Sequence, residues 1–233
     1  MKRINPNLLK LAHLTYNPNL ATPSLEEKVK DVPIVEEAKE IRGYIYVPTL
    51  KLYVAEQKIL LGNDWYDCHK GLQKKGMRML TLNEFAEFLK HLKENPDKKN
   101  KTILDEIVAV RDPWRSEWID ADFKVVKKKL HINYSHKVVN GNLQPQYSEP
   151  LQGHLTEDRL PGINFDYWIE HATSQGLPPQ KTPKGGLYYH APMSDNNSVA
   201  RFGADSSWAY LDCGGYPAIS NSALGVRAVR EKI

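Results

Sequence analysis

The sequence predicts an α+β fold, and the spacing of its apolar residues supports this prediction in two ways. Short runs rich in β-branched and aromatic residues occur near the start of the folded part and again in its last third, which is typical of strands. Between them, apolar residues recur every three or four positions in several segments, which predicts amphipathic helices. Because the strands occur in groups rather than alternating singly with helices, the pattern favours α+β.

The opening strands are predicted at residues 43–47 and 50–55, where Tyr, Ile, Val and Leu dominate. A proline and a threonine separate the two runs and predict a turn between them. A further short strand is expected at residues 58–61, before a Gly-Asn pair. The first part of the fold is therefore expected to be a strand hairpin.

The strongest helix prediction begins at Thr81. Thr81 and Glu84 form a capping-box pattern, which satisfies free N–H groups in the first turn of a helix. Apolar residues then recur at helical spacing as far as Leu92, and a following Asn-Pro pair ends the helix. Two further helices are predicted at residues 102–110 and 164–174.

The remaining strands are expected in two places. A β-hairpin is predicted in the middle of the chain, with strands at residues 123–133 and 138–147 and a tight turn at Asn140-Gly141. The closing strands are expected at residues 188–191, 198–202, 208–211 and 224–229.

Composition divides the chain into two parts. Residues 1–39 are rich in Asn, Pro, Glu and Lys and predict an N-terminal arm, which could pack on a neighbouring subunit and form a homo-oligomer. Residues 40–233 are expected to form one domain, because this length can bury a substantial core.

Several function classes are disfavoured by composition. The chain is 41% hydrophobic and 26% charged, which is typical of a soluble globular protein. No run approaches the roughly 20 apolar residues of a membrane span, and no apolar stretch follows Lys2 and Arg3, so we expect neither a membrane span nor a secretory signal. The expected location is the cytoplasm or a virus particle. A net charge of +4 without a basic stripe argues against a nucleic-acid partner.

Catalytic and metal-binding patterns are also weak. Cys68 and Cys213 lie far apart, and the sequence leaves open whether they are bonded. His69 follows Cys68 directly, but adjacent residues do not face each other on a helix or a strand. His131 and His136 lack the further ligands that a zinc site needs. We therefore expect no catalytic residue, no metal site and no cofactor.

Residues 111–118 contain two tryptophans, Trp114 and Trp118, among arginines and acids. Such a segment could bind a sugar or a peptide. It could also form a corner of the core, in which the tryptophans pack while the arginines pair with acids at the rim. The second interpretation is favoured.

Residues 199–230 are the most informative segment. Two apolar, strand-like pieces, at 208–211 and 224–229, frame small and mixed-polarity residues. Residues 212–221 show no alternation of apolar and polar residues, no charge pattern and no pair of catalytic side chains. A core strand or a catalytic loop would show at least one of these features. The segment therefore predicts an exposed surface held between two buried strands.

The run Gly203-Ala-Asp-Ser-Ser-Trp208 and the ending Ala223-Leu-Gly-Val-Arg-Ala-Val-Arg230 resemble the C-terminus of variable proteins of diversity-generating retroelements. The resemblance implies a C-type lectin fold of the subgroup that includes formylglycine-generating enzymes, with two main helices and mostly antiparallel strands. In that family an error-prone reverse transcriptase rewrites adenine-containing codons of this segment. The implied function is non-catalytic binding of a protein or surface ligand through a variable region at about 199–230.

Codon chemistry then selects the candidate positions. Asn, Ser, Tyr, Asp, Gly, Ala, Ile and Cys are all reached by changing adenines in an Asn codon, and these types dominate residues 205–221. Tyr offers contact area at low rotamer entropy, while Ser, Gly and Asn adapt their hydrogen bonds. The predicted ligand-binding residues are Ser206, Ser207, Tyr210, Asp212, Gly214, Gly215, Tyr216, Ala218, Ile219 and Asn221.

The framework around these positions is predicted as well. Trp208 has a codon without adenine, so we expect it to be fixed and packed beneath the site. Arg227 is expected to make a buried ion pair or hydrogen bonds to backbone carbonyls. The expected core anchors of the flanking strands are Leu211, Leu224, Val226 and Val229.

Two other classes of function stay open. The first is a structural or adhesion protein of a virus particle, with an invariant C-terminal segment and an arm that mediates oligomerisation. The second is an oxidase of the formylglycine-generating type, whose chemistry in that family relies on a reactive cysteine pair near the C-terminus. Only Cys213 lies in that region here, which argues against the oxidase.

Overall fold

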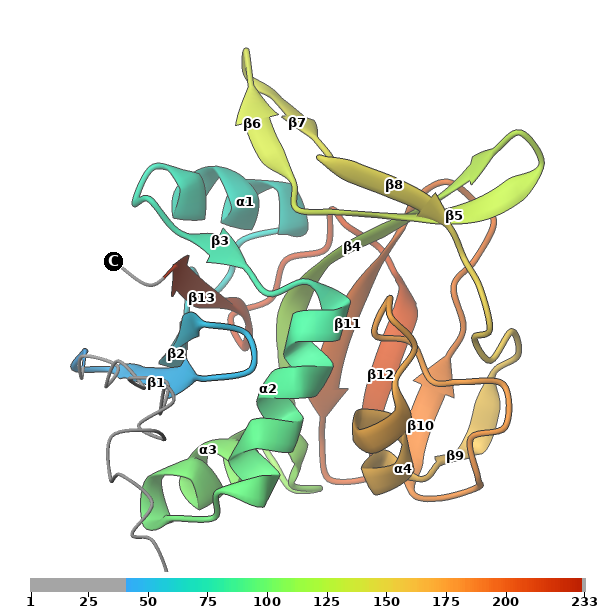
Figure 1. Ribbon diagram of the computed structural model, residues 1–233. Helices are drawn as coiled ribbons and strands as arrows, with labels where there is room; N and C mark the ends of the chain where they lie inside the picture. Colours follow the sequence, from blue (N-terminus) through green and yellow to red (C-terminus); the bar gives the residue numbers. More distant parts are fainter. Residues whose placement is uncertain (1–40, 232–233) are drawn as a thin grey trace, which may run out of the picture. The chain divides into compact units, whose positions relative to one another are not determined.

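The computed structural model in Figure 1 describes residues 41–231, and the predicted arm at 1–39 lies outside them. The α+β prediction is confirmed, since helices are combined with a large and mostly antiparallel sheet. The helices are α1 (Trp65–Gln73), α2 (Leu82–Glu94), α3 (Lys98–Val108) and α4 (Phe165–His171). The strands are β1 (Tyr44–Val47), β2 (Leu52–Ile59), β3 (Arg78–Met79), β4 (Arg115–Val126), β5 (Lys129–Tyr134), β6 (Lys137–Val139), β7 (Asn142–Gln144), β8 (Tyr147–Pro150), β9 (Arg159–Ile163), β10 (Leu187–His190), β11 (Ser198–Ala204), β12 (Ala209–Gly215) and β13 (Leu224–Glu231).

The main sheet has the strand order β1-β2-β13-β4-β11-β12-β10-β9 (Figure 1). β3 also pairs with β13, and β5 extends the sheet from β4 to β8. Two pairs are parallel, β4 with β13 and β10 with β12, whereas the other pairs are antiparallel. The last strand, β13, lies between β2 and β4 and so joins the opening strands to the rest of the sheet.

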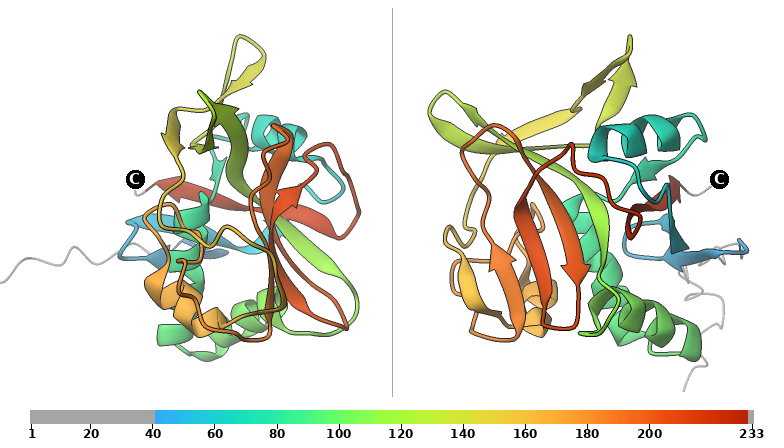
Figure 2. Two further views of the ribbon diagram at one scale, coloured as in Figure 1. Left: turned by 90° about the vertical axis from the view of Figure 1, so that its right-hand side faces the viewer. Right: turned by 180° about the vertical axis from the view of Figure 1, so that it is seen from behind.

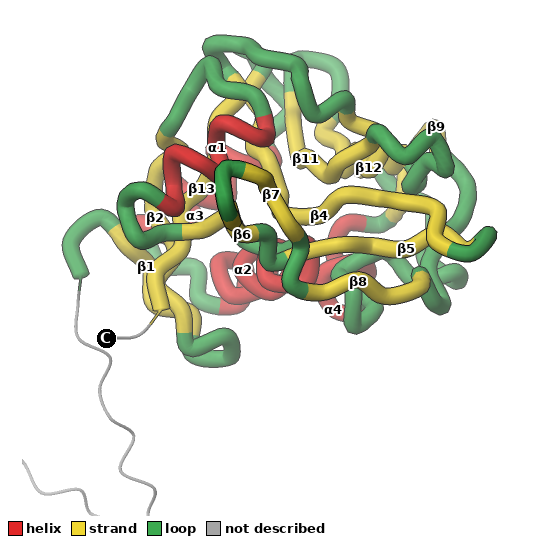
Figure 3. Tube along the Cα trace, turned by 90° about the horizontal axis from the view of Figure 1, so that it is seen from above, coloured by secondary structure: helices red, strands yellow, loops and turns green. Residues whose placement is uncertain are grey.

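Apolar side chains pack on both faces of the sheet. Phe88 of α2 shares one buried cluster with Ile119 of β4, and Trp65 of α1 shares a second cluster with Trp118 and Val226. Figure 3 shows the central strands between α1 on one side and α2 with α4 on the other. By contrast, β10, β12 and β11 have no helix in front of them in the right-hand view of Figure 2. Among residues 41–231, one face of these three strands is therefore free of helices.

The prediction for α2 is confirmed, including its start. The backbone N–H of Glu84 donates to Thr81 Oγ1 (3.3 Å), and the N–H of Thr81 donates to Glu84 Oε2 (2.9 Å). Arg78 donates from Nη1 and Nη2 to the two oxygens of the Glu84 carboxylate, both at 2.7 Å. The reciprocal cap and the arginine fork therefore fix the first turn of this helix.

The other helices differ from the predictions at their ends. α3 begins at Lys98 rather than at 102, because the side chain of Asp97 caps it and accepts from the N–H of Asn100 (2.7 Å). α4 ends at His171 instead of 174. α1 was not predicted. Its nine residues provide too few turns for a periodic signal, although Asp64 caps it by accepting from the N–H of Asp67 (2.7 Å).

The predicted strand at 123–133 is wrong, because the structure places a turn inside it. β4 ends at Val126 and β5 begins at Lys129, and Lys127 and Lys128 between them have φ angles of 48° and 66°. Left-handed backbone of this kind favours Gly or Asn, so a Lys-Lys pair gives no turn signal. The turn predicted at Asn140-Gly141 is confirmed and joins β6 to β7.

Arg227 makes both kinds of contact that the sequence predicts, a buried ion pair and hydrogen bonds to backbone carbonyls. Its side chain is only 4% exposed, and Nε lies 2.9 Å from Glu117 Oε2 on β4. Nη1 donates to the carbonyls of Ala55 (3.0 Å) and Glu56 (2.5 Å) on β2. This side chain therefore links β13 to both neighbouring strands. The predicted core anchors are all buried, namely Leu211, Leu224, Val226 and Val229.

We predict that Arg227→Met lowers the free energy of unfolding by about 3 to 5 kcal/mol, because it leaves the Glu117 carboxylate buried without a partner. The double variant Arg227→Met with Glu117→Leu should recover much of this loss, since it removes both charges. Urea unfolding measures both values. As a control, Arg111→Ala should cost less than about 1 kcal/mol, because its pair with Glu106 is exposed. A double variant no more stable than the single one would contradict the prediction.

Candidate ligand-binding site

The C-terminal segment folds as β11, β12 and β13 with two connections. Residues 205–208 join β11 to β12, and residues 216–223 join β12 to β13. Because β12 has seven residues at about 3.3 Å each, the two connections lie about 20 Å apart at its ends. The predicted site residues are therefore spread along one strand and both of its ends, rather than gathered in one loop.

Strand alternation gives β10, β11 and β12 one buried face and one face without a helix. Leu211, Phe202 and Tyr189 belong to the buried cluster shared with α2. Their neighbours along each strand point to the opposite side. This surface, here called the open face, consists of Tyr188, Arg201, Trp208, Tyr210, Asp212 and Gly214 with the exposed residues of the two connections.

Most of the predicted residues are accessible on this surface. Tyr216 is 56% exposed, and Gly214 is half-buried. The other exposed members are Ser206, Ser207, Ala218, Ile219 and Asn221.

Tyr210, Asp212 and Gly215 are instead buried. The Tyr210 hydroxyl accepts from Nε1 of Trp114 (2.7 Å), and burial raises the pKa of Tyr210. Asp212 Oδ2 lies 2.8 Å from Arg201 Nη2 and accepts from Arg201 Nε at 2.9 Å. Tyr210 and Asp212 thus already have partners within the protein, so they shape the open face more than they offer free groups to a ligand.

The two connections are held by their own hydrogen bonds. Asp205 Oδ1 accepts from the N–H groups of Ser207 (2.7 Å) and Trp208 (3.1 Å), and Asn221 Oδ1 accepts from the N–H of Ala223 (2.9 Å). The N–H of Trp65 at the start of α1 donates to the carbonyl of Pro217 (3.0 Å). Because these bonds fix the backbone of the loops in advance, less backbone entropy is lost when a ligand binds to them.

The expectation that Trp208 packs beneath the site is wrong. Trp208 is 40% exposed, and its ring stacks on Tyr188 with 4.9 Å between centroids and 7° between planes. Ala209 points into the core, so alternation directs Trp208 to the open face. The pair forms a flat aromatic platform. Sequence reasoning missed Tyr188 because it lies outside residues 199–230.

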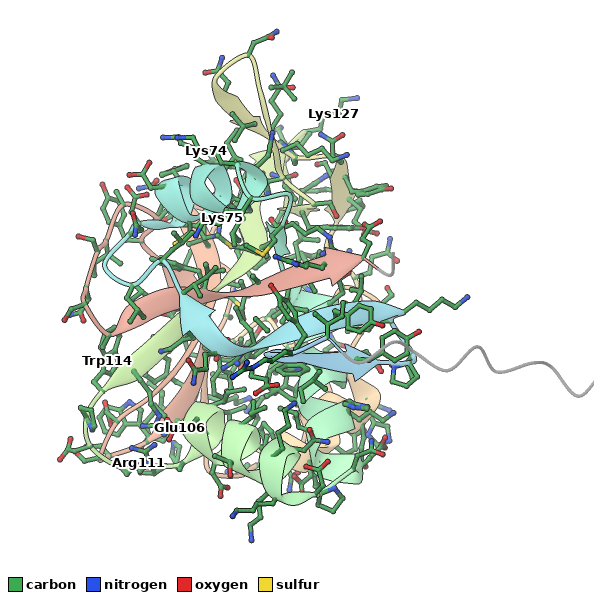
Figure 4. The ribbon with its side chains drawn as sticks, turned by 90° about the vertical axis from the view of Figure 1, so that its left-hand side faces the viewer. Lys74, Lys75, Glu106, Arg111, Trp114 and Lys127 are labelled. Carbon is green, nitrogen blue, oxygen red and sulfur yellow. The ribbon has the colours of Figure 1, made fainter. Side chains whose placement is uncertain are left out.

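The interpretation of residues 111–118 as a packing corner is confirmed for Trp118 and Arg111 but not for Arg115, which donates to backbone carbonyls instead of pairing with an acid. Trp118 is buried, and Arg111 pairs with Glu106 at the surface, with 2.8 Å between Nη2 and Oε1. Figure 4 shows Arg111, Glu106 and Trp114 close together. Trp114 is half-buried and supports Tyr210 through its indole N–H. This corner therefore contributes to the framework of the open face.

The structure answers the question left open about the cysteines. Cys68 and Cys213 are free and buried, and they belong to different clusters of the core. Burial raises the pKa of Cys68 to about 12 and that of Cys213 well above its ordinary value. Burial thus disfavours the reactive thiolate form of both side chains, and the two thiols lie in different clusters and not as a pair.

A buried histidine cluster was also missed by sequence reasoning. His69 of α1, Asp120 of β4 and His136, which follows β5, offer ligand atoms within 4.8 Å of one another. Burial lowers the pKa of His69 to about 4. Burial acts in the same direction on His136, but hydrogen bonds with Asp120 and Asp122 outweigh it and raise that pKa to about 9. The spacing of these residues along the chain gives no signal, because the fold alone brings them together.

Comparison with family models, with curated proteins and with solved structures finds no match to this chain. Within residues 41–231, no helix has the length and apolar character to cross a membrane. The open face and the buried histidine cluster are the features of these residues that bear most directly on function.

We predict that the adjacent glycines of β12 respond differently to Gly→Asn. At Gly215 an added Cβ would lie 2.9 Å from the carbonyl oxygen of Val199, which is closer than such contacts occur. At Gly214 the nearest atom is the terminal methyl of the exposed Met193, at 3.2 Å. Gly215→Asn should therefore cost about 1 to 3 kcal/mol and Gly214→Asn less than about 0.5 kcal/mol, as measured by urea unfolding. Equal costs would contradict this geometry.

A second prediction concerns Tyr210 and Tyr216, which the sequence analysis places in the same ligand-binding site. Tyr216→Ala should change the free energy of unfolding by no more than about 0.5 kcal/mol, because the side chain is exposed. Tyr210→Ala should cost about 3 to 5 kcal/mol, as for other large buried aromatics, and Leu224→Ala about 2 to 5 kcal/mol. Thermal and urea unfolding of the three variants measure these costs. A Tyr216 variant as unstable as the Leu224 variant would contradict the exposed position of that loop.

Proposed function

We propose that this chain is a non-catalytic ligand-binding protein with a C-type lectin-like scaffold, whose residues 199–230 form a variable region rewritten by a diversity-generating retroelement. The observation that carries the proposal is the open face. There, small and adaptable residues are exposed at both ends of β12, while the alternate residues of the same strand are buried. Side chains at such a surface can be substituted while the core of the protein stays the same.

The order of elements supports the lectin-like scaffold. The resemblance implies an opening strand, then two helices, then antiparallel strands that carry the site. The structure has opening strands β1 and β2, then α1 and the short β3, then the longest helices α2 and α3 in succession, and β11 and β12 at the open face. The final strand β13 pairs with β2, so the run Leu-Gly-Val-Arg that contributes to the resemblance lies at the centre of the sheet.

The burial pattern narrows the set of variable positions. A position that is rewritten freely must not be part of the core, since changes there cost several kcal/mol. Tyr210, Asp212 and Gly215 have little freedom by this criterion, because they are buried and in close contact. The proposed freely variable positions are Ser206, Ser207, Gly214, Tyr216, Ala218, Ile219 and Asn221.

The surface chemistry favours a protein ligand. The open face has the Tyr188–Trp208 platform at one end of β12 and the exposed Tyr216 at the other, with Ser206 and Ser207 in the first connection and Asn221 in the second. Rigid aromatic groups that provide area, beside small polar groups that adapt their hydrogen bonds, are typical of paratopes. Arg201 and Asp212 neutralise each other, so the middle of the face carries no unpaired charge from this pair.

The proposal predicts a second, near-identical copy of codons 199–230 in the DNA next to this gene, beside a reverse transcriptase gene. Sequencing of the flanking DNA tests this. The copies should differ only where the second one carries adenine, and the differing codons should be those of the exposed positions. Flanking DNA without such a copy would contradict diversification and favour the alternative, a viral structural or adhesion protein with a fixed C-terminal segment.

A further inference from the structure

The buried histidine cluster lies on the α1 side of the sheet. The ring of Trp65 stands edge-on to both histidines, with 4.4 Å between its centroid and that of His69 and 4.9 Å to that of His136. Asp120 Oδ1 is central, because it lies 2.5 Å from His136 Nδ1 and 3.7 Å from His69 Nε2. Three donor atoms from three different segments thus converge on one point.

His69 is the part of this cluster that the structure leaves unexplained. Its side chain is more than nine-tenths buried, yet Nε2 has no hydrogen-bond partner within residues 41–231. A buried polar atom without a partner costs free energy, so such atoms usually have a reason to be kept. The distance of 3.7 Å to Asp120 Oδ1 is too long for a hydrogen bond, but it leaves the Nε2 lone pair in reach of an ion bound to that oxygen.

Asp122 completes the surroundings of the cluster. Its Oδ1 lies 3.5 Å from His136 Nε2, on the far side of that ring from Asp120. A histidine that binds a metal through one nitrogen usually donates its other N–H to a carboxylate, which fixes the tautomer and the ring orientation. Asp122 is placed for that role, and His136 Nδ1 is then the nitrogen left for a metal.

A pocket borders the cluster. His69 and His136 both line it, and its volume is about 930 Å³ with Lys75, Arg78 and Glu231 among its other walls. Lys75 is labelled beside α1 in Figure 4. The pocket therefore reaches the two histidines, whereas Nε2 of His69 and the Asp120 carboxylate are themselves buried.

We propose that His69 Nε2, His136 Nδ1 and Asp120 Oδ1 bind a divalent transition-metal ion of the zinc type. Two imidazoles and a carboxylate form a donor set that zinc takes in sites with three protein ligands and one open position. Coordination bonds of about 2.0 to 2.2 Å require the donor atoms to be about 3.4 Å apart. Binding therefore draws His69 Nε2 closer to Asp120 Oδ1, from 3.7 Å, and moves His136 Nδ1 away from that oxygen, from 2.5 Å. The ion takes the place of the proton between His136 Nδ1 and Asp120 Oδ1.

The bound ion would also stabilise the framework of the open face. It joins α1 to β4, and the N–H of Trp65 at the start of α1 donates to Pro217 in the connection between β12 and β13. Ligands that bind only the folded protein raise its stability by mass action. The metal site is nevertheless independent of the proposed variable region, because none of its residues lies in 199–230.

Isothermal titration of EDTA-treated, desalted full-length protein with Zn²⁺ tests the proposal, together with the visible spectrum of the Co²⁺ form. We expect one ion per chain, a Co²⁺ spectrum of low coordination number and a higher melting temperature with Zn²⁺ than with EDTA. His69→Gln should abolish stoichiometric binding. This variant should still fold, since Nε2 makes no hydrogen bond that the substitution would break, and circular dichroism verifies it.

Two further variants make the test specific. Asp122→Asn should weaken zinc binding by about 10- to 100-fold, as loss of a carboxylate behind a metal-bound histidine does. His131→Gln is the matched control, because His131 lies on the adjacent β5 outside the cluster, and its affinity should equal that of the unaltered protein. Absence of stoichiometric binding by the unaltered protein, or unchanged binding by folded His69→Gln, would overturn the proposal.

Discussion

The place of β13 between β2 and β4 is the constraint on which the open face depends. Arg227 links β13 to both neighbours, through Glu117 on β4 and through the carbonyls of Ala55 and Glu56 on β2. Because β11 and β4 lie between β12 and β13 in the strand order, the connection at residues 216–223 must cross the ends of two strands to reach that place. Such a crossing connection cannot pack inside the sheet, so its residues are displayed at the surface. The position of β13 therefore creates one half of the candidate site, and the short turn between β11 and β12 creates the other.

Successive side chains of β12 point alternately to the core and to the open face, but a side chain that points to the open face is not always exposed. Leu211 and Cys213 face the helices, and Tyr210 and Asp212 face the other way. Trp114 and Arg201 then cover Tyr210 and Asp212 from the side. The accessible positions are consequently near the ends of the strand and in the two connections. A surface built in this way keeps a rigid middle and changeable ends, which suits a binding protein whose framework must stay constant.

The parts of the fold that are read most directly from the sequence are those fixed by local contacts. The capping box of Thr81 and the Asn140-Gly141 turn involve residues within three positions of each other, so their signals are readable along the chain. The turn at Lys127-Lys128 and the placement of Trp208 depend instead on partners elsewhere in the structure, β4 with β5 and Tyr188 respectively. The cluster of His69, Asp120 and His136 is the extreme case, because three segments that carry no shared motif meet only after folding. The candidate site was thus predicted as an exposed segment, but neither the contribution of Tyr188 nor the burial of Tyr210 and Asp212 was predicted.

The most direct measurement of the central claim is a substitution-tolerance profile of residues 199–230. Each codon is randomised in turn, the chain is displayed on cells, and folded molecules are sorted by resistance to protease. We expect tolerance to follow burial, with free substitution at the exposed ends of β12 and strong selection at its buried middle and on β13. Tolerance that bears no relation to burial, or exposed positions as restricted as Leu211, would contradict a display surface on a fixed framework.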